Sequence, residues 1–144
     1  MDISGNGTSV TVEGSVICSG DQGSHQGNGV QVTSDCQVQV KGDVDAAYTA
    51  INTGGTVEVG GDVTSGYGSY AYDGGSITVG GDMTSSNTTA VTASNGSTVT
   101  VGEDVTGTDA VKATGSSTVT VGGDATATGS SGTAVNANNS TVTV

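Results

Sequence analysis

The sequence predicts an all-β fold, a single parallel β-solenoid of roughly 20 residues per coil and about six to seven coils, with a right-handed β-helix favoured. Three observations predict it: one block of residues recurs along the chain, its valines alternate with polar residues, and the apolar residues are nearly all small. The 144 residues include 26 glycines and no proline, tryptophan or phenylalanine, and leucine and arginine are also absent. This composition favours strands and tight turns. A core of valine and alanine must be narrow, because small side chains cannot fill a wide gap.

The consensus of the recurring block is Thr-Val-Thr-Val-Gly-Gly-Asp-Val-Thr. The second valine of each full, weaker or half copy falls at position 12, 40, 59, 79, 101, 121 or 144, which gives intervals of 28, 19, 20, 22, 20 and 23 residues. A unit of this length cannot bury its own valines, whereas stacked units bury one another's. An antiparallel meander would need hairpin turns, and left-handed solenoids carry a six-residue pattern that is absent here. The repeat therefore predicts stacked parallel coils.

Each coil is expected to contain three strands. In the first, Val57 and Val59 point inward while Thr56 and Glu58 point outward, by the two-residue period of a strand. Gly-Gly-Asp then forms a corner, and the last two residues of the block begin a second, short strand. A looser element about ten residues before each block, such as Ala110-Val111, supplies the third strand.

We expect one domain over residues 1–144, with regular repeats over 37–144 and an irregular first coil over 1–36. The long first interval lies in residues 16–29, which we expect to form a loop bulging from that coil or a partial cap. The first residues lack the basic start and apolar stretch of a signal peptide, and the last residues lie within a strand pattern. We therefore expect a piece of a longer protein. An open strand edge also predicts end-to-end self-association.

The chain is strongly acidic, with a formal net charge of −12 from 14 acidic residues and two lysines, Lys41 and Lys112. Nucleic-acid binding requires a basic surface, so we expect no nucleic-acid partner. Anionic membrane surfaces are disfavoured for the same reason. No apolar run approaches the ~20 residues of a membrane span, so no membrane insertion is expected.

The residues of common active sites are sparse. His25 is the only histidine, and with Asp21 nearby we expect it to be a solvated loop residue. No serine lies in a nucleophile elbow, and no triad can be assembled. Cys18 and Cys36 lie at distant phases of the repeat, so we expect two buried thiols rather than a disulfide. We expect no enzyme and no resident cofactor, with calcium as the one alternative.

One aspartate per coil stands at the same corner. Neighbours about 4.8 Å apart would repel by about 1 kcal/mol in water. We expect each carboxylate to accept backbone N–H groups of its own turn. Calcium shared between adjacent coils is the alternative, because carboxylates and turn carbonyls are suitable ligands, although the spacing is not that of the nonapeptide calcium repeat. The candidate calcium ladder comprises Asp43, Asp62, Asp82, Asp104 and Asp124.

The outward positions of the main strand form two rows of hydroxyls. This array resembles the Thr-x-Thr faces of β-solenoid antifreeze proteins, which implies ice binding. The simpler explanation is that threonine suits an exposed strand, and Gln37, Gln39 and Glu58 interrupt the rows. The candidate ice face comprises Thr78, Thr98, Thr100, Thr118, Thr120, Thr141 and Thr143.

The aromatic residues cluster in one part of the chain. Tyr67, Tyr70 and Tyr72, with Tyr48 one coil earlier, are the only ones. Tyr67, Tyr70 and Tyr72 are a candidate glycan-stacking patch. Alternatively, the tyrosines fill a corner of a core that is short of bulk.

The block followed by an Ala-Val slot resembles the repeats of large bacterial surface proteins with β-helical adhesin-like regions, over about Gln37 to Val144. The resemblance implies extracellular display at a bacterial cell surface and carries over no catalytic residue. We therefore expect a structural or adhesive, non-catalytic repeat segment of a secreted or cell-surface protein, with a host glycan or protein as its ligand. Ice binding, and glycan binding or processing, are the alternatives.

Overall fold

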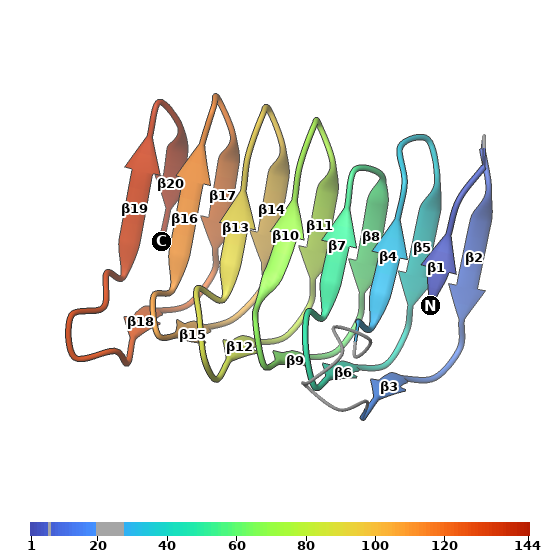
Figure 1. Ribbon diagram of the computed structural model, residues 1–144, viewed down its shortest axis with the longest axis horizontal. Coiled ribbons are helices and arrows are strands. Elements are labelled where there is room, and N and C mark those ends of the chain that lie inside the picture. Colours follow the sequence, from blue (N-terminus) through green and yellow to red (C-terminus); the bar gives the residue numbers. More distant parts are fainter. Residues whose placement is uncertain (6, 20–27) are drawn as a thin grey trace.

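The computed structural model describes residues 1–5, 7–19 and 28–144, and these residues form strands and turns without a helix. Three parallel sheets run along the molecule (Figure 1). Sheet A contains β1 (Asp2–Ile3), β4 (Val30–Val32), β7 (Ile51–Thr53), β10 (Ser69–Ala71), β13 (Val91–Ala93), β16 (Val111–Thr114) and β19 (Val135–Asn138). Sheet B contains β2 (Ser9–Val12), β5 (Gln37–Val40), β8 (Thr56–Val59), β11 (Ser76–Val79), β14 (Thr98–Val101), β17 (Thr118–Val121) and β20 (Thr141–Thr143). Sheet C contains β3 (Val16–Cys18), β6 (Val44–Ala46), β9 (Val63–Ser65), β12 (Met83–Ser85), β15 (Val105–Gly107) and β18 (Ala125–Ala127).

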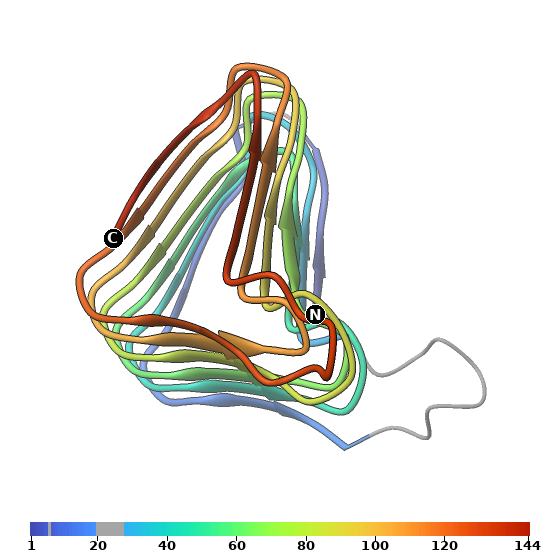
Figure 2. The same cartoon turned by 90° about the vertical axis from the view of Figure 1, so that its left-hand side faces the viewer.

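Each coil passes through sheets A, B and C in turn, so coil 1 is β1–β3, coil 2 is β4–β6, and so on to coil 6, β16–β18; β19 and β20 continue the stack. The cross-section is triangular (Figure 2). Seen from the C-terminal end, the chain runs up sheet A, down sheet B and across sheet C, anticlockwise as it approaches the viewer. The molecule is therefore a right-handed parallel β-solenoid, and the predicted fold class is confirmed.

The register of sheet B follows the valines of the repeated block. Val12 pairs with Val40, Val40 with Val59, and Val59 with Val79, and the same column continues to Val101 and Val121. Equivalent positions of the repeat thus stack directly on one another. Because a shift of one residue would turn every valine toward solvent, the alternating pattern fixes this register.

The core is narrow and made of small side chains, as the composition predicts. Its centre is a column of fully buried valines and isoleucine from sheet B, such as Val57, Ile77 and Val99, packed against residues of sheets A and C. Burying one such side chain contributes about 1.5–3 kcal/mol. Small residues line the inward side near the corner between sheets C and A, among them Ser65 and Ser85, which are also buried. No tyrosine belongs to this core.

The two cysteines are not bonded to each other. Cys36 is buried, and its Sγ donates a hydrogen bond to the carbonyl oxygen of Gly5 at 2.6 Å. Cys18 is only half-buried, at the inward end of β3. The expectation of two buried thiols is therefore correct for Cys36 alone, because Cys18 lies in the first coil, where stacking covers one side only.

The first three residues of the loop expected over residues 16–29 belong to a strand instead. Residues 16–18 form strand β3, in which Val16 pairs with Val44 and Cys18 with Ala46. The alternation Val-Ile-Cys matches that of the equivalent strands, although no Gly-Gly-Asp corner precedes it. Asp21 and His25 lie outside the described residues.

In the part of the chain that the structure describes, no helix has the length and apolar character needed to cross a membrane.

Candidate functional site

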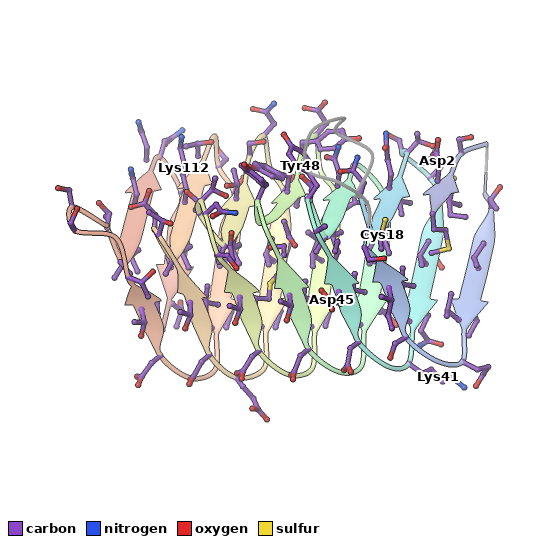
Figure 3. The ribbon with its side chains drawn as sticks, turned by 60° about the horizontal axis from the view of Figure 1, so that its bottom comes forward. Asp2, Cys18, Lys41, Asp45, Tyr48 and Lys112 are labelled. Atoms are coloured by element: carbon purple, nitrogen blue, oxygen red, sulfur yellow. The ribbon has the colours of Figure 1, made fainter. Side chains whose placement is uncertain are left out.

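The aspartate column lies at the corner between sheets B and C, which Lys41 marks in Figure 3. Each aspartate after the first donates its backbone N–H to Oδ1 of the aspartate in the preceding coil. The bonds run from Asp62 to Asp43 (3.0 Å), Asp82 to Asp62 (3.0 Å), Asp104 to Asp82 (2.9 Å) and Asp124 to Asp104 (2.8 Å). The N–H of Asp43 is bonded in the same way to Oγ of Ser15, at 3.0 Å. We call this chain of bonds the aspartate ladder.

The ladder differs from the expected local turns. Each carboxylate oxygen reaches forward to the next coil rather than back into its own turn, so the side chains join coils. The glycine before each aspartate explains how they fit: a Cβ at Gly61 or Gly81 would collide with Oδ1 of Asp43 or Asp62. From coil 2 onward, Glu103 is the only residue other than glycine that directly precedes an aspartate of the ladder. The Asp104–Asp82 bond remains there, while the N–H of Glu103 bonds the Gly81 carbonyl at a longer 3.3 Å.

The ladder also accounts for how the like charges are tolerated. One oxygen of each of the first four aspartates accepts an amide proton, and hydrogen bonds to a charged acceptor are stronger than neutral ones. Among the described residues, no group of three or more His, Cys, Asp or Glu side chains is placed to hold a metal ion. Calcium binding by the column therefore remains a prediction.

The threonine array occupies the outer face of sheet B. Thr78, Thr100, Thr120 and Thr143 form one row in register, and Ser76, Thr98, Thr118 and Thr141 form the other. Rows are about 6.7 Å apart along a strand, and hydroxyls about 4.8 Å apart between coils. Toward the N-terminal end, Nε2 of Gln39 donates to Oε2 of Glu58 at 3.2 Å, which replaces the hydroxyls by a larger polar pair.

A second threonine row lies on the outer face of sheet C, beside Asp45 in Figure 3. It comprises Thr64, Thr84, Thr106 and Thr126, which are in register. The final threonine of the repeated block carried this signal, but it was interpreted only as part of a short strand. The aspartate ladder lies between this row and the array on sheet B. The sheet B array continues as uncharged residues from Ser76 to Thr143.

The tyrosines lie on and beside sheet A, outside the core. Tyr48 and Tyr67 occupy the corner between sheets C and A in adjacent coils, with ring centroids 4.5 Å apart and planes inclined by 34°. Tyr70 lies at an outward position of β10, and Tyr72 follows it toward the corner between sheets A and B. All four are half-buried. They do not fill the core, so the alternative explanation of these residues as core filler is not what the structure shows.

The chain has no significant match among protein-family models, curated proteins or solved structures. Its fold and its stacked columns define its class, that of the parallel β-solenoid repeat proteins.

Proposed function

We propose that this chain is a non-catalytic, structural and adhesive repeat segment of a secreted or cell-surface bacterial protein. One observation carries the proposal: equivalent residues stack coil after coil on all three faces, in continuous registers such as Thr98 on Thr118 on Thr141. Such a rod presents long, repetitive surfaces suited to spacing and to multivalent contact.

The placement of the lysines supports a non-catalytic role. Lyases and hydrolases with β-helix folds work through basic and acidic residues gathered in one cleft. Here Lys41 lies at the corner between sheets B and C, where its Nζ is 2.7 Å from Oε2 of Glu13. Lys112 lies on the outer face of sheet A, in register with Thr92 and Asn136. The two cations thus belong to different faces of the rod.

The experiment is a retention assay. Beads coated with the chain are passed over mucin, collagen and bacterial-cell surfaces, with albumin-coated beads as the control, and the protein is separately incubated with pectin, alginate and host glycans. We expect retention above the control on at least one surface and no turnover. Turnover of any of these polymers, or retention no greater than that of albumin, would contradict the proposal.

Ice binding is the second candidate, because the two hydroxyl rows on sheet B remain in register and uncharged from β11 to β20. Thermal hysteresis and ice recrystallisation at millimolar protein test it. On this hypothesis, Thr100→Lys abolishes the activity, whereas the matched change Thr84→Lys on sheet C leaves it intact. Absence of any effect of the wild type on ice removes this candidate.

A further inference from the structure

The four tyrosines belong to two neighbouring coils. Tyr48 precedes β7 in coil 3, and the other three surround β10 in coil 4. Since these are the only aromatic residues in the chain, sheet A and the corner before it carry all of its aromatic surface. We call Tyr67, Tyr70 and Tyr72, with Tyr48 beside Tyr67, the tyrosine strip.

The strip runs along the strand direction of sheet A. Ser69 and Ala71 are each 1% exposed and point inward, so Tyr70 between them points outward. Tyr72 directly follows the strand and is half-buried. Tyr72 rests against Gly54 of coil 3, where an added Cβ would lie 3.1 Å from Cε2 of the ring. At the other end, the backbone N–H of Tyr67 donates to the carbonyl of Tyr48 at 3.0 Å. Figure 3 shows Tyr48 at the outer surface of this corner.

Packing does not require an aromatic residue at the central position. Tyr70 pairs with Asn52 in coil 3 and with Thr92 in coil 5, and the same column continues to Gln31 and Lys112. Every other coil therefore places a polar side chain there. Tyr70 adds apolar surface to a face that the fold itself leaves polar, and such an exception points to contact with another molecule.

The neighbours of the strip have the chemistry of sugar recognition. Aromatic rings offer flat apolar surfaces with a polar end, on which the C–H face of a pyranose ring can stack. The amides of Asn52 and Gln31 on one side, and the hydroxyl of Thr92 on the other, donate and accept hydrogen bonds as sugar hydroxyls require.

The negative charge of the chain favours uncharged glycans over anionic ones. The chain carries a net charge of −12, and Asp73 directly follows the strip. A polyanion would be repelled, whereas an uncharged polymer would not.

We propose that the tyrosine strip binds a neutral polysaccharide, with successive sugar rings on successive tyrosines. This inference rests on the proposed adhesive function and names the ligand class of its contact surface.

Affinity electrophoresis in gels containing hydroxyethylcellulose, xyloglucan or yeast mannan tests the proposal, with polygalacturonate as the anionic comparison. We expect at least one neutral polymer to retard the wild type.

Tyr70→Thr places at this position the residue that coil 5 carries, so the fold should tolerate the change. It should weaken binding about tenfold or more. Tyr70→Phe keeps the ring and should remain within about twofold of the wild type. Thr84→Ala, on sheet C, is the matched control and should bind as the wild type does, and the unfolding midpoint by circular dichroism confirms that each variant is folded.

Three results would overturn the proposal: no retardation by any of the neutral polymers, equal binding by Tyr70→Thr, or equal retardation by polygalacturonate. The bead assay separates this inference from the function on which it rests. Wild-type beads that adhere while no neutral polymer retards the chain would refute the strip alone, whereas wild-type beads that fail to adhere would refute the adhesive function.

Discussion

Two corners of the same coils differ in how strictly they repeat. Between sheets B and C, every link has the same length, occupying residues 13–15, 41–43, 60–62, 80–82, 102–104 and 122–124. Between sheets C and A, the links vary in length. The links that follow coils 2 to 6 occupy residues 47–50, 66–68, 86–90, 108–110 and 128–134. Much of the variation in repeat interval is absorbed at this second corner.

The constant corner is held by the coil beneath it. The N–H of Gly81 donates to the carbonyl of Gly61 at 3.1 Å, and the aspartate ladder adds a side-chain bond to each step. There is little room, since a Cβ at Gly80 would lie 2.5 Å from the carbonyl oxygen of Gly60. The variable corner carries Tyr48 and Tyr67 and the start of the tyrosine strip. The comparison indicates that one corner stacks the coils and the other is free to acquire recognition, as surface loops generally are.

Insertion of one glycine between Gly80 and Gly81 should have the largest effect. It would displace at least three inter-coil bonds: Gly81 to Gly61, Asp82 to Asp62, and Val63 to Asp82. At about 1 kcal/mol each, the free energy of unfolding should fall by about 3 kcal/mol. Thermal unfolding followed by circular dichroism should show a midpoint lower by about 10 °C.

The matched control is one glycine inserted between Asn87 and Thr88. These residues lie in the variable corner between β12 of sheet C and β13 of sheet A. Because links of different length already occur there and longer loops cost little closure entropy, the midpoint should change by less than about 3 °C. Equal damage from both insertions would show that the two corners are equally constrained, against the comparison drawn above.

Replacing one aspartate of the ladder should have a smaller effect. Asp82→Ala removes the acceptor of the Asp104 N–H, at an exposed corner where water can substitute in part. We expect a loss of about 1 kcal/mol and a midpoint lower by about 3–5 °C. Asp82→Asn retains an acceptor oxygen and removes one of the stacked charges, so its stability should be equal to that of the wild type or slightly higher.

Asp124→Ala provides the control for position in the column. Asp124 donates to Asp104 through its backbone, which the substitution retains. No described residue is seen to bond its carboxylate, so the loss should be smaller than for Asp82→Ala. If Asp82→Asn destabilises as much as Asp82→Ala, charge rather than hydrogen bonding holds the corner.

The two corners also differ in how far the sequence predicts them. The alternation of Val57 and Val59 with polar residues, and its recurrence, was sufficient to predict sheet B and its register, whereas strand β3 of sheet C was expected to be part of a loop. The direction of the aspartate bonds was predicted wrongly, because a sequence shows an aspartate beside its own turn and not the N–H of the coil stacked upon it. At the variable corner, composition revealed Tyr48 and Tyr67, but only the three-dimensional stacking shows that their rings meet.

The smallest expected effect is that of calcium on the ladder. The carboxylates of Asp43, Asp62, Asp82 and Asp104 each already accept a backbone proton, so a cation has little to add. An ion bound only by the folded state would stabilise it by about 2.7 kcal/mol at a hundredfold excess over its dissociation constant. That would raise the unfolding midpoint by several degrees.

We expect instead a small rise that magnesium reproduces at equal ionic strength, as screening of a chain with net charge −12 would produce. Asp82→Asn combined with Asp104→Asn should reduce this response only slightly. A calcium-selective rise that the double variant abolishes would instead identify the constant corner as an ion-binding column, and both corners would then be sites of recognition.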